Sequence, residues 1–270
     1  MRLSWIFADP SFSPVVSGGC VTLAAIYLIA GRCNGGWSRA RSVAYVVGLG
    51  VIAFALQSGV ASFDDRLLSM HMIEHILLLD LAPPLLLLGE PARLALLSLP
   101  RRPRRAVGRT LTALGRRSGA VGCLLLSAAM ILLLHVPVVF DTALAHPLLH
   151  ALDHLLFVVA GVIMWWPILG RPNPRRIGPG VHVIYLTTAM LPMAIIGAYL
   201  NRATSLFYPV YGAPARALGV SALTDQQNAG AIMLVAGTAV MGLIGLFAVM
   251  AALLGAERRQ QARELYEVLG

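Results

Sequence analysis

The chain has 270 residues, of which 58% are hydrophobic and only 12% charged, and its mean hydropathy is +0.77. These values exclude an ordinary soluble domain and indicate a membrane protein that crosses the bilayer several times. The formal net charge of +9 rests on arginine alone, because none of the 21 basic residues is lysine.

Seven apolar segments are long enough to span a bilayer, at about 20 residues each. They run approximately over 14–31, 42–60, 69–89, 119–139, 149–169, 181–200 and 229–254. The sequence therefore predicts an all-α protein, a bundle of seven transmembrane helices that forms one domain over residues 1–270. The longest connections, 90–118 and 201–228, are expected to be loops.

The arginines predict the orientation of these spans. One side carries Arg32, Arg39, Arg41, the eight arginines from Arg93 to Arg117, Arg171, Arg175, Arg176, Arg258, Arg259 and Arg263. The other side carries only Arg2, Arg66, Arg202 and Arg216. The positive-inside rule then places the N-terminus outside and the C-terminus in the cytoplasm. We expect the basic loops to contact anionic lipid and not nucleic acid.

The third span, 71-HMIEHILLLDLAPPLLLLGEP-91, contains polar residues that lipid penalises. His71 and His75 are four residues apart and therefore share one helical face in the outer half of the span. Asp80 falls nearly opposite and must be neutral or partnered at that depth. Pro83 and Pro84 predict a bend in the helix.

The fifth span begins with a ladder of His146, His150 and His154, again at four-residue spacing. Asp153 is expected on the face of His146 and His150. His135, at the outer end of the fourth span, is open to either a ligand or a structural interpretation, and His182 is interpreted as structural.

Histidine pairs from two helices are a workable set of ligands for copper, zinc or iron. The candidate metal ligands are His71, His75, His146, His150 and His154. Glu74 or Asp153 is a candidate to orient a ligating imidazole through its other nitrogen. The alternative is a purely structural hydrogen-bond cluster. Met70 and Met72 are the methionines with the best claim to a Cu(I) ligand role.

Near the last span, 222-ALTDQQNAGAIM-233 places Asp225 and Gln226 on the histidine side of the membrane. One interpretation is a helix N-terminus capped by Thr224 or Asp225. The other is that Asp225 and Gln226 help to close the histidine site.

No catalytic or nucleotide-binding motif is present, since G-x-S-x-G and G-x-x-x-x-G-K are absent. We therefore expect no enzyme activity. The absence of C-x-x-C-H excludes covalently attached c-type haem, but b-type haem with histidine ligands and a role in electron transfer remains an alternative. A transporter or channel built around Asp80 is a third hypothesis, and the absence of an internal repeat counts against it.

Three ordered motifs resemble the seven-helix CtaG family of cytochrome c oxidase assembly factors. They are H-M-x-x-H-x-L-L-x-x-x-A-P-P-L-L-x-L-G-x-P at 71–91, H-P-x-L-H-x-x-x-H-x-x-F-x-x-A-G-x-x-x-W-x-P-x-L-G at 146–170, and D-Q-Q-x-A-G-x-I-M at 225–233. The resemblance extends from about residue 40 to residue 250.

This resemblance implies a multi-pass protein of the bacterial cell (inner) membrane that helps copper reach cytochrome c oxidase subunits. It also implies that the five candidate histidines, with Asp225 and Gln226, carry the function. Copper is accordingly the expected cofactor, with haem b as the alternative.

Overall fold

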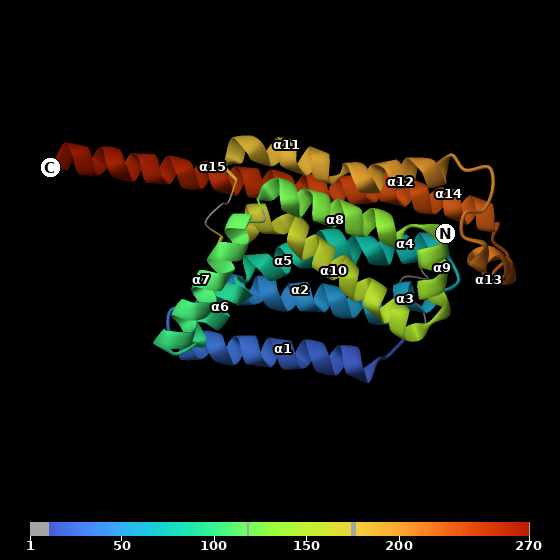
Figure 1. Cartoon of the computed structure of the whole chain (residues 1–270), viewed down its shortest axis with the longest axis horizontal. Helices are drawn as coiled ribbons and strands as arrows, with labels where there is room; N and C mark the ends of the chain where they lie inside the picture. Colours follow the sequence, from blue (N-terminus) through green and yellow to red (C-terminus); the bar gives the residue numbers. More distant parts are fainter. Residues whose placement is uncertain (1–10, 118, 174–176, 270) are drawn as a thin grey trace.

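The computed structural model describes residues 11–117, 119–173 and 177–269, and within them it is helical with no β-strand (Figure 1). The helices are α1 (Pro14–Cys33), α2 (Arg39–Gln57), α3 (Gly59–Phe63), α4 (Leu68–Ile76), η2 (Leu77–Leu81), α5 (Ala82–Leu88), α6 (Pro91–Ser98), α7 (Arg101–Arg117), α8 (Ala120–Leu134), α9 (Pro137–Ala145), α10 (Pro147–Leu169), α11 (Pro179–Ala189), α12 (Leu191–Asn201), η3 (Pro209–Tyr211), α13 (Gly212–Ala217), α14 (Ala222–Ile232), η4 (Met233–Gly237) and α15 (Thr238–Leu269). The predicted all-α class is confirmed.

Six of the described helical segments are long and apolar enough to cross a bilayer, and a seventh span results if the bent pair α8–α9 counts as one. Their outer surfaces are apolar: Val15 is 83% and Leu148 is 86% exposed. Exposure of such large apolar side chains to water is unfavourable, which indicates that they contact lipid. The chain is a multi-pass membrane protein, as predicted.

The fourth span differs from its predicted extent of 119–139. Helix α8 stops at Leu134, and α9 leaves it at an angle of 68°. Pro137 has no N–H for the helical ladder and disfavours a helical conformation at Val136, so the bend comes at this point. Helix α8 alone is 15 residues, about 22 Å long, and does not cross a typical bilayer core.

The last span also begins earlier than predicted, at Ala222 instead of residue 229, and it continues through η4 into α15. Its N-cap is Ser221, whose hydroxyl oxygen accepts a hydrogen bond from the Thr224 N–H at 3.4 Å. The expectation that Thr224 or Asp225 caps this helix is therefore wrong. Asp225 is free to contact another helix.

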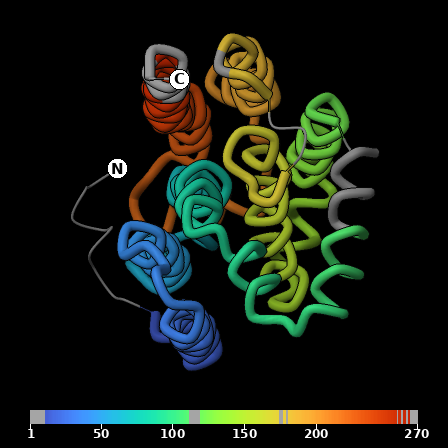
Figure 2. The backbone as a smooth tube through the Cα atoms, turned by 90° about the vertical axis from the view of Figure 1, so that its left-hand side faces the viewer, coloured from blue at the N-terminus to red at the C-terminus, as the bar shows by residue number. Residues whose placement is uncertain are grey.

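The third predicted span lies at the centre of the bundle (Figure 2). Its segments α4, η2 and α5 contact α2, α10 and α14, and 67% of its most apolar stretch is buried, against 6% for α1. Helix α10 approaches it closely at Gly161, where a Cβ would overlap the Leu79 carbonyl oxygen and the Pro83 ring. A central helix that neighbours enclose can hold polar side chains away from lipid.

The double proline does not break this central helix. The structure places a π turn, η2, directly before Pro83 and Pro84, and the helix continues through α5. A wider turn accommodates a proline ring that would otherwise clash with the carbonyl of the preceding turn. A second π turn, η4, lies in the last span and contacts α4.

Arginine-bearing segments gather at one end of the bundle, where α6, α7 and the end of α15 lie at the left of Figure 1. The connection 90–118, expected to be a loop, is largely these two helices, α6 and α7. Of the arginines used to predict orientation, Arg2, Arg175 and Arg176 lie outside the described residues. The predicted assignment of this end to the cytoplasm stays a prediction.

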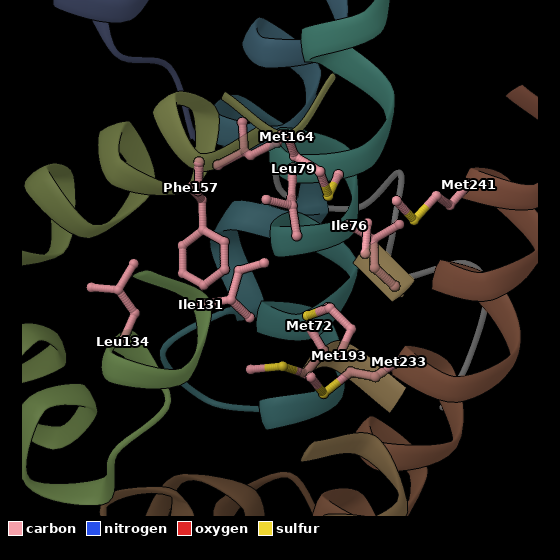
Figure 3. Close-up of a cluster of buried hydrophobic side chains, with 14 of the residues drawn as sticks. Met72, Ile76, Leu79, Ile131, Leu134, Phe157, Met164, Met193, Met233 and Met241 are labelled. Carbon is pink, nitrogen blue, oxygen red and sulfur yellow. The ribbon is translucent and has the colours of Figure 1, made fainter. Parts of the chain in front are cut away.

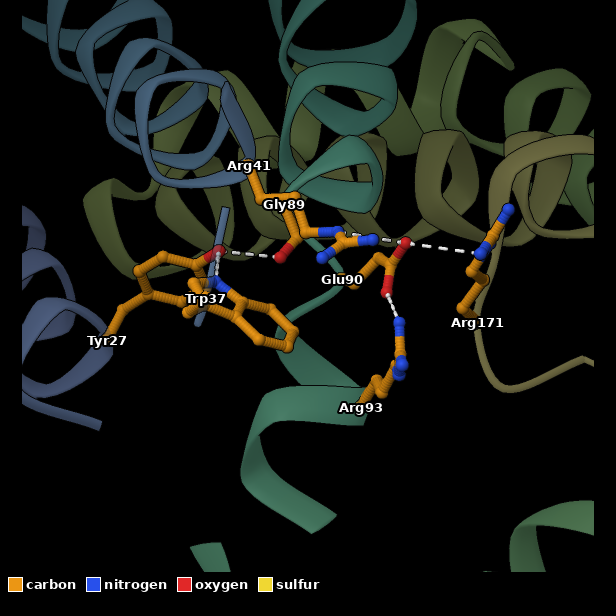
Figure 4. Close-up of polar contacts among 7 residues, drawn as sticks. All are labelled: Tyr27, Trp37, Arg41, Gly89, Glu90, Arg93 and Arg171. Atoms are coloured by element: carbon orange, nitrogen blue, oxygen red, sulfur yellow. Dashed lines mark hydrogen bonds and ion pairs between the residues drawn. The ribbon is translucent and has the colours of Figure 1, made fainter. Parts of the chain in front are cut away.

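Glu90 joins three of the connections at this end (Figure 4). It adopts a left-handed conformation at φ 52°, and its carboxylate lies 3.2 Å from Arg41, 2.8 Å from Arg93 and 3.5 Å from Arg171. Next to it, the Tyr27 hydroxyl donates a hydrogen bond to the Gly89 carbonyl at 2.6 Å. The Glu90 carboxylate thus links the ends of the second, third and fifth spans, and the Gly89 carbonyl adds the first.

We expect Glu90→Gln to lower the free energy of unfolding by about 1–3 kcal/mol, between the values for exposed and buried ion pairs. The three arginines would lose their shared counter-charge, and added salt should narrow the difference. Thermal unfolding in detergent measures both effects. The control is Asp65→Asn, which removes an exposed pair with Arg66 and should change little; equal losses in the two variants would contradict the role of Glu90.

Candidate metal centre

Four histidines from two helices converge at the other end of the bundle. His71 and His75 project from α4, and His150 and His154 project from α10. The ring centroid of His71 lies 4.3 Å from that of His75, 5.3 Å from that of His150 and 6.0 Å from that of His154. The predicted meeting of the two helical faces is present in the structure.

Three carboxylates lie among these imidazoles. Asp153 Oδ2 is 3.3 Å from His75 Nε2, Glu74 Oε2 is 3.5 Å from His154 Nε2, and Asp64 Oδ2 is 3.4 Å from His150 Nε2. Glu74 and Asp153 were expected near the histidines. Asp64 was not expected there, although the pair Asp64–Asp65 between the second and third spans was a visible signal.

The donor atoms form three overlapping groups, each with its atoms within 4.8 Å of one another. The groups are His71, His75, Asp153 and His154; Asp64, His71 and His150; and Asp64, Glu74 and His154. Two tetrahedral ligands bound to one zinc ion at about 2.1 Å lie about 3.4 Å apart, so the most distant atoms of a group would have to approach each other by up to roughly 1.4 Å for coordination. Small side-chain rotations provide such a shift.

Several of these buried polar atoms have no hydrogen-bond partner among the described residues. They include both ring nitrogens of His71 and of His75, both carboxylate oxygens of Glu74, and the Nε2 atoms of His150 and His154. Buried polar groups are costly unless they are paired or coordinate a metal. The donor set therefore fits a metal ion that prefers imidazole and carboxylate ligands.

Asp64 lies between two spans, and its electrostatics agree with this interpretation. Burial raises the pKa of its carboxyl above the ordinary value for aspartate, because the charged form is desolvated. A bound cation would offset that cost.

The fifth candidate ligand, His146, is not brought into the cluster. It is the N-cap residue of α10, it is exposed, and it belongs to none of the three donor groups. The helix begins only at Pro147, so the four-residue ladder loses its helical geometry at its first member. The other two histidines of the series, His150 and His154, lie beside the histidines of α4.

His135 lies beside the cluster without joining a donor group. Its ring centroid is 5.6 Å from that of His75, and its Nδ1 is 2.8 Å from the Ile131 carbonyl oxygen. A carbonyl only accepts, so Nδ1 carries the proton, and Nε2 is buried without a hydrogen-bond partner among the described residues. Phe157 stacks on His75 with centroids 3.6 Å apart and holds that ring in place.

Asp225 and Gln226 support the centre from a distance and do not contact the histidine rings. Asp225 accepts hydrogen bonds from the Ser69 hydroxyl at 2.5 Å and the Ser69 N–H at 3.3 Å, two residues before His71. Gln226 accepts a bond from the Phe207 N–H and donates one to the Ser205 carbonyl. The hypothesis that Asp225 and Gln226 help to close the histidine site is supported only through their contacts with neighbouring segments. Asp225 positions α4, and Gln226 positions the loop at residues 203–208.

That loop and the turn η3 that follows it cover one side of the cluster with aromatic residues. The Tyr208 hydroxyl donates to the His135 carbonyl at 2.8 Å, and the Tyr211 hydroxyl donates to the Asp64 carbonyl at 2.8 Å. Both rings pack on Phe140, which itself lies 4.8 Å from His71. This aromatic cover was not predicted, because the spacing of Tyr208 and Tyr211 alone does not indicate where the loop folds.

We expect Asp225→Ala to destabilise the protein by about 1–3 kcal/mol, because it leaves the buried Ser69 hydroxyl and N–H without their acceptor. The start of α4 should then be less well ordered, and metal affinity should fall with it. Thermal unfolding and metal titration measure the two effects. Thr224→Ala is the control, since that neighbouring side chain is exposed; an equal effect there would contradict the anchoring role.

Met70 and Met72 are buried among apolar side chains. Met70 packs with Leu67 and Ala215, and Met72 packs in the main core with Met193 and Met233. The three donor groups described above consist of nitrogen and oxygen atoms.

A groove leads from the lipid-facing side to this centre. Its volume is about 1030 Å³, and it is lined along its length by apolar side chains such as Leu49, Leu56 and Val158. Asp64, Glu74, His150 and His154 also line it. The centre is thus accessible along a groove lined by α1, α2 and α10.

Comparisons with known proteins agree with these motifs. Uncharacterized protein Mb0105 of Mycobacterium bovis and uncharacterized protein MT0111 of Mycobacterium tuberculosis are each 29% identical over 196 residues, which cover 65% of this chain and 30% of the relative. Uncharacterized protein ML1998 of Mycobacterium leprae is 27% identical over 246 residues, 86% of this chain and 37% of the relative. The chain thus spans about a third of the length of these curated relatives, and no solved structure matches it.

The family model described as cytochrome c oxidase caa3 assembly factor (Caa3_CtaG) matches residues 23–254, which include all the residues of the centre. The chain belongs to this family of cytochrome c oxidase assembly factors.

Proposed function

We propose that this protein assists the assembly of a cytochrome c oxidase by binding copper at the histidine–carboxylate centre and passing it to an oxidase subunit. The role is non-catalytic, with copper as cargo. The family membership supports the assembly role. The buried donor atoms without hydrogen-bond partners support a metal at this centre.

The single observation that carries the proposal is the convergence of His71, His75 and His154 with Asp153 inside the membrane domain. Imidazole suits copper, zinc and iron alike, and the family description favours copper among them. Carboxylates beside the imidazoles orient the rings and offset the positive charge of the ion.

The groove supports transfer within the membrane. Its apolar length suits a transmembrane segment of the receiving subunit, and its polar end exposes His150 and Asp64. His150 is the most exposed of the four converging histidines, with its side chain 19% accessible. We propose that the ion leaves through the His150 side, because the His71 and His75 rings are enclosed.

The geometry favours a metal ion over haem b. A porphyrin ring needs a slot between its two axial histidines, yet the His71 and His75 rings contact each other edge to face, and His75 stacks directly on Phe157. Three carboxylates among the imidazoles also suit a cation better than an apolar macrocycle.

Metal analysis and an absorption spectrum of the same purified sample test the proposal. We expect copper to bind stoichiometrically, and we expect no Soret band. A strain that lacks the protein should assemble an oxidase deficient in copper, and exogenous copper should partly restore it. A preparation with a Soret band, or one that takes up no copper, would overturn the proposal.

A further inference from the structure

A second cluster of polar and sulfur-bearing side chains lies in the core, on the other side of the central span. Asp80 is only 3% exposed, and no hydrogen bond or ion pair of its carboxylate is among the contacts of the described residues. It lines a small cavity together with four methionines and the Thr238 side chain. The methionines are Met164, Met190, Met193 and Met241.

The backbone around this cavity is built to make room for the carboxylate. Asp80 lies in the π turn η2, and Gly237 ends the π turn η4. A Cβ placed on Gly237 would lie 3.7 Å from Asp80 Oδ2, so the carboxylate lies against this glycine. Two π turns in contacting spans at one buried acid are unusual, and such turns occur often at functional sites.

The methionines reach this cavity from three elements other than the central span. Met164 belongs to α10, Met241 to α15, and Met190 and Met193 flank the start of α12. Figure 3 shows Met164 beside Leu79, Met241 extending toward Ile76, and Met193 beside Met72 and Met233. Four methionines and one aspartate from four elements therefore line one small cavity.

The cavity is large enough for only one water molecule or one ion. Its volume is about 10 Å³, which is close to the minimum for one water molecule or one ion. The single carboxylate balances one positive charge, whereas a divalent ion would leave a net charge in the hydrocarbon region. Sodium and potassium prefer oxygen ligands, while thioether sulfur selects Cu(I).

We propose that Asp80 and the surrounding methionines form a Cu(I) site that is separate from the histidine–carboxylate centre. Its ligands are thioether sulfurs, and Asp80 supplies the compensating charge. It holds the reduced ion, which needs no redox step to enter or leave. Copper binding at this site does not depend on copper binding at the histidines. A protein with both sites would hold copper in two different ligand environments.

Cu(I) titration in a His71→Ala/His154→Ala background isolates this site. Purified protein under ascorbate is titrated against a chromophoric Cu(I) chelator, and Ag(I) serves as a redox-inert probe of the same site. We expect one equivalent of either ion. Asp80→Asn should weaken binding at least tenfold, and Met193→Leu/Met241→Leu should abolish the equivalent.

Met233→Leu is the matched control, because this methionine is equally buried in the same core but does not line the cavity. It should bind the ion as the background protein does. X-ray absorption of the Cu(I)-loaded background protein gives a test that needs no cavity variant, and it should show sulfur neighbours. Absence of sulfur scattering, absence of bound ion, or an equal loss in Met233→Leu would overturn the proposal.

The two proposals fail separately. If wild-type protein binds copper only through its histidines, the Asp80 site is wrong and the histidine centre stands. If the histidine variants bind as much copper as wild type, through sulfur alone, the histidine centre is wrong and the Asp80 site stands. If Asp80→Asn leaves Cu(I) affinity unchanged, Asp80 retains only a proton or a water molecule, and the Asp80 site is wrong.

Discussion

His71→Ala is expected to lower copper affinity at the histidine–carboxylate centre by at least about 100-fold, since even residues that only orient a metal ligand are worth 10–100-fold. Of the three residues that two donor groups share, His71 is the most buried, at 1% exposed. Neither of its ring nitrogens has a hydrogen-bond partner among the described residues. Removing the ring should therefore cost the metal-free protein little, because an unsatisfied polar group leaves with it.

His146→Ala is the matched control for this variant. It removes the same side chain from the same family motif, but His146 is exposed and outside the cluster. Copper binding and oxidase maturation should both stay at the wild-type level. Equal losses in the two variants would show that His146 takes part in binding, and no loss in His71→Ala would contradict the proposed centre.

Gly161→Ala is expected to have the second large effect, although it adds one methyl group far from any donor atom. The new Cβ would overlap the Leu79 carbonyl oxygen and the Pro83 ring, and backbone atoms cannot move aside as a side chain can. Helix α10 must then shift away from the central span. We expect a loss of about 1–3 kcal/mol in the free energy of unfolding, as for other overpacked cores.

The same shift should separate His71 and His75 on α4 from His150 and His154 on α10, so copper affinity should fall together with stability. Gly122→Ala is the control, because a Cβ at this exposed helical position meets nothing within 4 Å. Thermal unfolding and copper titration of both variants provide the measurement. A Gly161→Ala protein with wild-type stability would show that the two helices are not in close contact.

The sequence was sufficient for the features that depend on local pattern. Apolar segment length predicted the membrane spans, since lipid admits only helices whose backbone bonds are internal. The four-residue spacing put His71 with His75 and His150 with His154, because the helical period is a property of the backbone. The same period separated Asp80 from His75, and the structure places Asp80 in a different cavity.

Predictions that depended on where a helix begins or ends were less successful. His146 was counted with the ladder of α10, but the helix starts one residue later. The last span was expected to begin at residue 229, but the helix begins seven residues earlier, at Ala222, after its N-cap Ser221. Helix ends are decided by a few competing hydrogen bonds, which an apolar window does not detect.

Composition, apolar segments and helical spacing by themselves determined a membrane-embedded helical bundle with paired histidines on its third and fifth spans. Only the tertiary structure decided that Asp64 joins them, that Asp225 anchors Ser69, and that Asp80 meets methionines from three other elements. The reason is physical: spacing along one helix fixes which side chains share a face, whereas the partners of that face depend on how separate helices pack. Close packing at residues such as Gly161 makes that choice, and it is a property of two surfaces at once.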